Sequence, residues 1–250
     1  MSAYGCFSEY YDELMSNVEY GRIAMYYSNL IKDKNSSAET LLDLAGGTGS
    51  LSVLFADMGY DVICLDASPD MLSIARQKAE KAAMAEKIFF VCQYMQELEL
   101  YEPVDCVVCA LDSLNHLESA EDVQETFKRI AANLTGGGVL VFDVNTPYKH
   151  SEILAGNTFV IEDEDVFCVW QNEYDETDAS TDICLDFFVC DGDGKYSRYS
   201  EEFTERAYET EELEKMLETA GFRVDGIYDE QEKRAPSSDA QRVVFVAVKN

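Results

Sequence analysis

The sequence is poor in basic residues and in histidine, and it has no long apolar run. Its 250 residues contain 19 Lys and Arg against 49 Asp and Glu, so the formal net charge is −30. A surface with this charge repels phosphate backbones and anionic lipids, and we therefore expect no nucleic acid and no membrane among the partners. No apolar stretch approaches the ~20 residues of a membrane-spanning helix, and no signal peptide is visible. Only two histidines are present, which leaves few candidates for a general base near neutral pH.

The eight cysteines lie mostly within apolar stretches. This placement fits buried free thiols in a reducing compartment better than a disulfide framework, and we predict a cytoplasmic protein. Cys106 and Cys109 form a CxxC pattern of the kind that binds metals or exchanges disulfides. Because they lie on a predicted strand, their side chains should point to opposite faces, so we predict two core cysteines and no metal site.

Strand-like and helix-like stretches alternate over the first 150 residues. Residues 4–31 have the pattern of one or two amphipathic helices rich in aromatic side chains. Ser68 with Pro69, and Ser119 with Asp122, mark the starts of two later helices. Continuous apolar strands that alternate with helices predict an α/β fold, in which helices cover both faces of a parallel sheet. The predicted strands are residues 40–45, 61–66, 87–93, 104–112 and 137–146.

The pattern changes between about residue 157 and residue 208, where no helical period is visible. Long strand-like runs are separated by polar turns at residues 178–182 and 191–194, which predicts an antiparallel subdomain inserted into the α/β framework. A helix from Thr210 to about Gly221 follows, and two last strands complete the chain. Their short connection predicts an antiparallel pair, so one of them is a reversed strand. An exposed edge of the inserted sheet could pair two chains, and we expect a monomer or a homodimer.

A glycine-rich turn joins the first predicted strand to its helix. Asp43 lies near the end of the strand, and residues 45–49 (AGGTG) form the turn. Glycines let a ligand approach the main chain closely, and the following helix offers unpaired N–H groups. Ligands of open parallel sheets lie at the carboxyl ends of the strands, where Asp66 ends the second strand and can accept hydrogen bonds from ribose hydroxyls. Together these features predict an adenosine-type ligand.

The same turn distinguishes between two such ligands. A dinucleotide site needs GxGxxG, and Ser52 occupies the position of the third glycine. The Asp43 carboxylate would repel a pyrophosphate and favour a ligand that carries an ammonium group. S-adenosylmethionine has an α-ammonium, a sulfonium and a ribose diol, so we predict this cofactor, with S-adenosylhomocysteine as its product. Asp43 is then assigned to the cationic end, indirectly or through water, and Asp66 to the ribose. A nicotinamide dehydrogenase is the remaining alternative.

Four stretches in this order carry a family resemblance. They are LLDLAGGTG, VICLDASPDML, DCVVCALDSLNHL and LTGGGVLVFDVNT, and they resemble successive motifs of class I S-adenosylmethionine-dependent methyltransferases. The whole chain resembles small, mostly uncharacterised bacterial members and small-molecule amine N-methyltransferases. The resemblance implies a Rossmann-like, seven-stranded, mostly parallel sheet with a reversed C-terminal strand. It also implies an N-terminal helical lid at 1–35, a cofactor-binding methyltransferase domain at 36–150 and 209–250, and an inserted antiparallel β subdomain at 151–208.

The resemblance also implies a set of cofactor-binding residues. Two positions depart from the family pattern. Ala45 replaces the first glycine of the turn, which is tolerable if its φ stays negative, and Tyr94 replaces an acid that contacts the adenine amino group in many relatives. The main chain at Met95 or stacking on the Tyr94 ring could supply the adenine contact instead. The predicted set is Asp43, Ala45, Gly46, Gly47, Gly49, Asp66, Ala67, Met71, Tyr94, Met95, Leu111 and Asp112.

Two histidines and one tyrosine are the main candidates for chemistry. His116 follows the fourth strand at the ligand edge and is a candidate general base or substrate contact, with loop packing or helix capping as the alternative. His150 follows the fifth strand and ranks lower. Tyr11 lies in the stretch that resembles the family's lid helix and could close over the methionine end; the alternative is a buried aromatic of an amphipathic helix. Asp112 and Asn115 could orient substrate or cofactor, or serve in a turn and a helix cap.

The inserted strands carry aromatic residues of two possible uses. We predict that most form the subdomain core, while some could line the acceptor pocket and receive an alkylammonium group. They are Phe167, Trp170, Phe187, Phe188 and Tyr199. The predicted function is methyl transfer to a small-molecule acceptor, with nitrogen favoured over oxygen. The alternatives are a methyltransferase that acts on protein or RNA and a non-catalytic S-adenosylmethionine sensor or scaffold.

Overall fold

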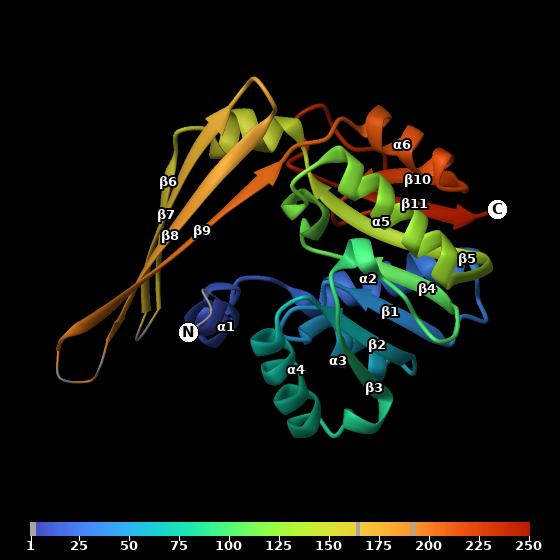
Figure 1. Cartoon of the computed structure of the whole chain (residues 1–250), viewed down its shortest axis with the longest axis horizontal. Helices are drawn as coiled ribbons and strands as arrows, with labels where there is room; N and C mark the ends of the chain where they lie inside the picture. Colours follow the sequence, from blue (N-terminus) through green and yellow to red (C-terminus); the bar gives the residue numbers. More distant parts are fainter. Residues whose placement is uncertain (1–3, 164–165, 191, 193) are drawn as a thin grey trace.

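The main body is one seven-stranded sheet, and the computed structural model describes residues 4–163, 166–190, 192 and 194–250. The strand order is β10-β11-β5-β4-β1-β2-β3 (Figure 1). β11 pairs antiparallel with both of its neighbours, β10 and β5, and the remaining pairs are parallel, so the predicted reversed strand is the last one. The bounds are Thr40–Leu44 (β1), Asp61–Asp66 (β2), Ile88–Cys92 (β3), Val104–Cys109 (β4), Leu134–Asn145 (β5), Phe222–Asp229 (β10) and Arg242–Lys249 (β11).

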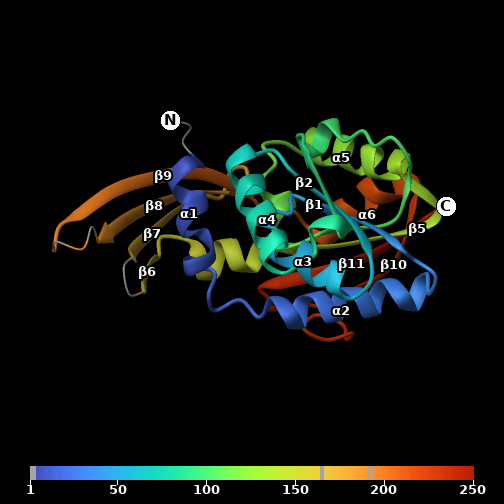
Figure 2. The ribbon, with the colours of Figure 1, turned by 90° about the horizontal axis from the view of Figure 1, so that it is seen from below.

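Helices cover both faces of this sheet, as the alternating pattern predicts (Figure 2). One apolar cluster joins the sheet to α5 and α6, and a second joins it to α2, α3 and α4. Cys109 belongs to the first cluster and Cys106 to the second, so the CxxC pair points to opposite faces. The helix bounds are Tyr20–Lys34 (α2), Ser50–Asp57 (α3), Pro69–Lys81 (α4), Ala120–Asn133 (α5) and Thr210–Thr219 (α6).

The predicted helix starts are confirmed by their hydrogen bonds. Ser68 accepts a hydrogen bond from the Met71 amide, and Ser119 accepts one from the Asp122 amide. Each bond satisfies an amide of the first helical turn that has no partner within the helix. The strand predicted from residue 137 already begins at Leu134, because Leu134 pairs with Val104 of β4.

The inserted segment forms a separate antiparallel sheet in the order β6-β7-β8-β9. It projects from the main body as a long arm, on the left in Figure 1. The turn predicted at residues 191–194 includes residues 191 and 193, which lie outside the described residues. The bounds are Thr158–Glu162 (β6), Val166–Asp175 (β7), Ser180–Cys190 (β8) and Tyr196–Arg206 (β9).

One face of the inserted sheet holds its apolar core, and we call it the inner face. The buried residues of this core are Val166, Cys168, Ile183, Leu185 and Phe187. Of the five aromatics predicted for this core, Phe187 is buried and Trp170 packs against it. The prediction is wrong for Tyr199, which is 42% exposed. Phe167 and Phe188 are half-buried and face each other across β7 and β8, away from the core by strand alternation.

Helix α1 (Tyr4–Leu14) lies between the inserted sheet and α4 (Figure 2). Tyr10 and Leu14 pack against the inner-face core. On the other side, Asp12 reaches the side chain of Lys78 on α4, with a shortest N–O distance of 2.7 Å. The predicted N-terminal helices therefore exist, and the first of them touches both parts of the fold.

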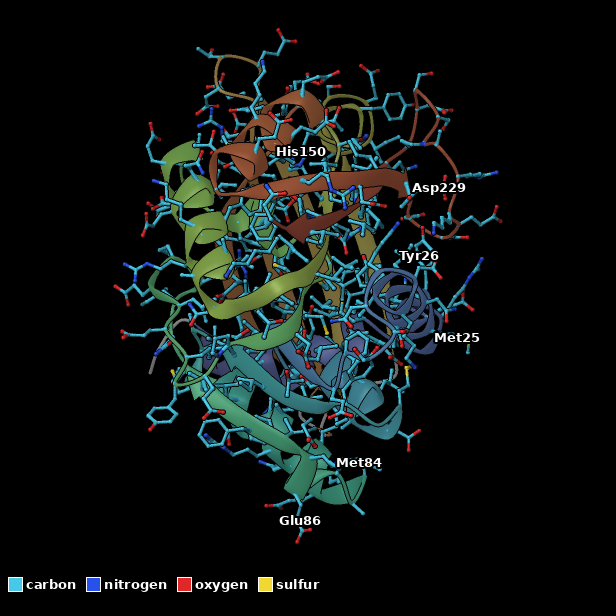
Figure 3. The ribbon with its side chains drawn as sticks, turned by 90° about the vertical axis from the view of Figure 1, so that its right-hand side faces the viewer. Met25, Tyr26, Met84, Glu86, His150 and Asp229 are labelled. Carbon is cyan, nitrogen blue, oxygen red and sulfur yellow. The ribbon has the colours of Figure 1, made fainter. Side chains whose placement is uncertain are left out.

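Short helical turns and a long loop complete the fold. Three 3₁₀ turns cover Ala85–Lys87 (η1), Met95–Glu97 (η2) and Ser113–His116 (η3), and a π-helical turn covers Lys149–Leu154 (η4). The connection between β10 and β11 spans residues 230–241, longer than the short link that the sequence suggested. Tyr26 of α2 donates a hydrogen bond to the Asp229 carbonyl where this loop begins (Figure 3).

The cysteines are less uniformly buried than predicted. Cys92 at the end of β3 is exposed, and Cys184 and Cys190 are half-buried. All seven cysteines whose side chains the structure describes are free thiols. Separately, no helix among the described residues is long and apolar enough to cross a membrane.

Candidate active site

A cleft of about 240 Å³ lies at the carboxyl ends of the parallel strands. This is the edge at which open α/β sheets bind ligands. Most of the predicted site residues line it. They are Tyr11, Asp43, Ala45, Gly46, Gly47, Asp66, Met71, Met95, Leu111 and His116.

The glycine turn forms the floor of the cleft. Gly47 has φ +54°, and a Cβ added to it would meet no atom within 4 Å, so space for a ligand is open there. Its amide donates to Asp66 Oδ2 at 2.9 Å, which ties the turn to the end of β2. Gly46 serves packing, because a Cβ there would lie 2.8 Å from Cys64 Sγ and 3.0 Å from Asp43 Oδ2.

Ala45 corrects one expectation from the sequence. Its φ is +59°, in the left-handed region, although we predicted that alanine would require a negative φ there. A non-glycine residue in this region is strained by about 1 kcal/mol or more. The surrounding hydrogen bonds hold the turn, since the next amide, that of Gly46, donates to the Leu65 carbonyl at 2.9 Å. The alanine therefore strains the turn without displacing it from the cleft.

Asp43 lies beneath the turn and is only 2% exposed. Its Oδ2 accepts a hydrogen bond of 2.5 Å from the Ser52 hydroxyl. Burial raises the pKa of Asp43 to about 7, against the lowering effect of the Ser52 hydrogen bond. The carboxyl group is therefore easier to protonate than that of a free aspartate, and it lines the cleft from beneath the turn.

Asp66 stands at the rim of the cleft with both oxygens partly used by the main chain. Oδ2 accepts the Gly47 amide, and Oδ1 accepts the Ser68 amide at 2.8 Å. Burial raises the pKa of Asp66, while these two amide hydrogen bonds oppose the shift. Each carboxylate oxygen can accept a further hydrogen bond, so hydroxyl groups of a ligand can still bind there.

Four predicted site residues do not line the cleft. Gly49 instead lets α3 approach α4, because a Cβ there would lie 2.8 Å from the Cβ of Ala75. Tyr94 is 59% exposed, and Ala67 follows Asp66 outside the cleft wall. Asp112 is held by Arg242 at 3.2 Å and by Asn145 at 2.5 Å.

The sequence did not indicate a cluster that fastens α1 over the turn. Lys78 Nζ binds Asp12 on α1 and also lies 3.0 Å from Thr48 Oγ1 and 2.7 Å from Ser50 Oγ. Thr48 in turn donates to Asp12 Oδ1 at 2.7 Å. We call these four residues the lid latch. The four residues are spread over residues 12–78 and belong to no motif, so nothing in the sequence indicated that they meet.

Tyr11 brings helix α1 to the cleft. It lines the cleft together with Tyr20 of α2. Burial is the main cause that raises the pKa of Tyr11 well above its ordinary value. Tyr11 therefore stays a protonated phenol, which can donate a hydrogen bond and is unsuited to act as a base.

His116 meets the inserted sheet at the other side of the cleft. Its Nε2 lies 3.7 Å from Oε1 of Glu205 on β9, and its ring lies 5.0 Å from the ring of Phe203. His150 is fully buried on η4, with Nδ1 2.7 Å from Thr181 Oγ1 and Nε2 3.9 Å from Glu205 Oε2. Burial lowers the pKa of His150 to about 4, so this imidazole is neutral. Glu205 was not predicted, because its strand looks like an ordinary polar edge.

Asn115 has a structural role. Its amide nitrogen donates to the carbonyls of Asn145 and Arg206, and its oxygen accepts the Asn145 amide at 3.0 Å. These bonds join the end of β5 to the end of β9. The turn and capping alternative thus describes Asn115 better than substrate orientation.

A second missed residue, Asp143, holds the turn after β4, whose Leu111 lines the cleft. It accepts the amides of Leu111 and Asp112 at 2.8 Å each, a hydrogen bond of 2.5 Å from Tyr27, and an ion pair from Arg242. Leu111 and Asp112 both have left-handed φ values, 59° and 56°, and these bonds hold that conformation. The sequence contained a signal for Asp143, because it is an acid inside the apolar run VLVFDVN and a buried charge needs a partner.

The donor set suits an organic ligand with hydroxyl and cationic groups. The open space over Gly47, the rim carboxylate of Asp66 and the imidazole of His116 face one cleft. No group of three His, Cys, Asp or Glu side chains among the described residues is placed to hold a metal ion. The cleft therefore fits an adenosine-type cofactor.

Comparisons with known proteins agree with this geometry. A family model described as a methyltransferase domain matches residues 41–138. The candidate methyltransferase YqeM of Bacillus subtilis (strain 168) is 34% identical over 248 residues, which cover 99% of this chain and 97% of that protein. The crystal structure of a S-adenosylmethionine-dependent methyltransferase from Clostridium acetobutylicum ATCC 824 matches with a TM-score of 0.89 at 30% identity, and the match covers 99% of each chain.

Several relatives have a named amine acceptor. The dTDP-3-amino-3,6-dideoxy-alpha-D-glucopyranose N,N-dimethyltransferase of Streptomyces fradiae is 30% identical over 125 residues, which cover 50% of this chain and 47% of that protein. This partial match concerns only half of the chain, whereas the two matches above extend over nearly all of it. From those full-length matches, together with the cleft at the carboxyl ends of β1 and β2, the chain belongs to the S-adenosylmethionine-dependent methyltransferases.

Proposed function

We propose that the protein transfers the methyl group of S-adenosylmethionine to the nitrogen of a small-molecule amine. Family membership supplies the cofactor and the type of reaction, and the acceptor is what we infer. The inference depends on one observation, the imidazole of His116 in the wall of the cleft with the buried Glu205 carboxylate 3.7 Å behind it. A relative that dimethylates an amino sugar supports it.

The cofactor residues are part of the same proposal. Gly47 leaves room for the cofactor against the main chain, and Asp66 accepts its ribose hydroxyls. The main chain at Met95 contacts the adenine, since Met95 lines the cleft while Tyr94 does not line it and is exposed. Asp43 acts on the α-ammonium through water, because its Oδ2 already binds Ser52.

The chain's own contribution to the chemistry is alignment and proton removal. The bound cofactor provides a methyl group that its sulfonium activates for in-line displacement. A protonated amine has no free lone pair, so a base must first take its proton, and His116 is the candidate in the cleft. Tyr11 remains protonated and orients the reactants. The net charge of −30 favours a cationic or neutral acceptor over an anionic one.

Methylation of an acceptor panel with a ¹³C-methyl cofactor tests the proposal. The panel pairs each amine, including amino sugars and amino acids, with the analogue in which a hydroxyl replaces the amino group. We expect S-adenosylhomocysteine to form with at least one amine, and the ¹³C signal to have the chemical shift of an N-methyl group. The hydroxyl analogues should give no product.

Two results would argue against the proposal. An O-methyl or C-methyl product would show that the acceptor atom is wrong. Tight binding of S-adenosylhomocysteine with no turnover on any amine would favour the sensor or scaffold alternative.

A further inference from the structure

The inserted sheet reaches into the active site through two neighbouring side chains of β9. Phe203 packs against the His116 ring at 5.0 Å, and Glu205 places a carboxylate oxygen 3.7 Å from His116 Nε2. Both come from the inner face of the arm, while His116 belongs to the turn after β4. The imidazole is therefore held from one side by a segment outside the cofactor-binding domain.

The Glu205 carboxylate is buried, and its basic partners among the described residues are the two histidines. The residue is 5% exposed, and it has no ion pair with a lysine or arginine within the described part of the chain. Burial raises its pKa, and the negative charge of Asp112 acts in the same direction. The nearby His116, a hydrogen bond of 3.2 Å from the side-chain amide of Asn145 and the nearby Lys149 oppose the shift. A buried carboxylate in this setting gains from any further donor.

Of the two histidines beside Glu205, only His116 is open to the cleft. The side chain of His116 is 43% exposed, whereas His150 is enclosed and neutral because burial lowers its pKa to about 4. The Nδ1 of His150 is already bound to Thr181. The carboxylate can thus support a charged imidazole at only one position, which is His116.

We propose that Glu205 is a positioning residue that fixes the ring nitrogen with which His116 accepts a proton. This inference rests on the proposed amine methylation. A carboxylate that accepts a hydrogen bond from Nε2–H selects the tautomer in which Nδ1 has the free lone pair. The present 3.7 Å separation is longer than a hydrogen bond, and such contacts shorten when the ligands fill an active site.

The proposed step moves one proton to His116 and one methyl group to the acceptor nitrogen. The ammonium group of the acceptor gives one proton to Nδ1 of His116, and the freed nitrogen lone pair forms the new N–C bond. The S–C bond breaks, and its electron pair stays on sulfur, which changes from sulfonium to thioether. The imidazolium then lies against the Glu205 carboxylate, which stabilises its charge in the same way that a carboxylate supports a catalytic histidine in hydrolases.

The presence of only two histidines makes the tautomer directly measurable. We would record ¹⁵N spectra of the full-length protein with its histidines labelled, at alkaline pH where a free imidazole is neutral. The His116→Asn variant assigns the signals. In the wild type we expect His116 to show a protonated Nε2 and an unprotonated Nδ1. In Glu205→Met the same signals should move to the averaged positions of a tautomer mixture.

Glu201→Met is the matched control. Glu201 is also buried on β9 and faces the same side, but it lies four positions before Glu205, about 13 Å along a strand. The control should leave the His116 spectrum and the turnover unchanged. Glu205→Met should lower kcat about 10- to 100-fold, while the KM for the acceptor and the affinity for S-adenosylhomocysteine change less than about twofold. Glu205→Gln retains an acceptor oxygen, so it should restore the tautomer and part of the turnover.

An unchanged His116 spectrum in Glu205→Met would overturn the proposal, and so would a wild-type His116 protonated at Nδ1. If the methionine variant fails to fold, the glutamine variant decides the question, because full wild-type turnover there would remove the need for the carboxylate. A missing amine acceptor would not alter the spectra. Failure of the proposed function and failure of this inference are therefore separable.

Discussion

Replacing Asp43 by asparagine should change how the stability of the protein depends on pH. Asparagine has the same shape and can still accept the hydrogen bond from Ser52, so the packing under the glycine turn is retained. What it removes is the ionisation of a carboxyl group whose pKa burial raises from 3.8 to about 7.

The magnitude follows from this difference between the folded and the unfolded chain. Below about pH 4 the carboxyl is protonated in both states, and its contribution to stability is fully present. As the pH rises toward 7, the unfolded chain releases the proton while the folded chain retains it, so the wild type loses stability. An interval of about three pH units at about 1.4 kcal/mol each amounts to a loss of about 4 kcal/mol.

Urea unfolding of both proteins between about pH 4 and about pH 8 measures this difference. The free energy of unfolding of Asp43→Asn minus that of the wild type should increase by about 4 kcal/mol across the range and then level off. The subtraction cancels the repulsion among the many surface acids. Asp57→Asn, an exposed change on the neighbouring α3, is the control and should follow the wild-type curve. Parallel curves for Asp43→Asn and the wild type would refute the argument that burial controls this carboxyl.

Three further changes test the cleft and its surroundings. Asp66→Ala should weaken S-adenosylhomocysteine binding about 5- to 150-fold, the equivalent of about 1–3 kcal/mol for polar groups left unpaired, whereas Asp61→Asn at the other end of β2 should have no effect in calorimetry. Gly49→Ala should lower the free energy of unfolding by about 2 kcal/mol or more, because the new Cβ would lie 2.8 Å from that of Ala75 and the residue has a φ of +74°. Adding Ala75→Gly to this variant should remove the steric contact but not the backbone strain. An unchanged free energy of unfolding in urea for Gly49→Ala would contradict the packing argument. Lys78→Met should weaken S-adenosylhomocysteine binding about fivefold and make α1 easier to cleave by proteases, since the partly exposed latch contributes about 1 kcal/mol; equal cleavage rates would show that the latch does not hold the lid.

The sequence predicted the architecture well because each signal in it was local and repeated. Apolar runs, capping serines and polar turns identified the strands, the helix starts and the inserted sheet. The glycine turn with its two acids indicated the cofactor, and the family resemblance agreed with it. The glycine turn and Asp66 do lie at one cleft, as expected from the rule that ligands bind at the carboxyl ends of parallel strands.

The missed features depend on contacts between distant segments. Glu205 looks like any polar residue on a strand, and only the folded chain brings it from β9 to His116. The lid latch joins Asp12 to Lys78 across 66 positions of sequence. Ala45 shows a different limit, because the sequence reveals that an alanine replaces a glycine, whereas its φ is set by the hydrogen bonds around the turn.

The position of α1 has a kinetic consequence. Its outer side packs on the inserted sheet, and its other side is fastened to the glycine turn by the lid latch. A single helix therefore borders both the glycine turn, where we propose that the cofactor binds, and the place where an acceptor would meet His116. If this helix must move for exchange, the two ligands cannot come and go independently. We expect an ordered sequence in steady-state kinetics, with the cofactor entering first, the methylated acceptor leaving before S-adenosylhomocysteine, and release of that last product limiting the turnover rate.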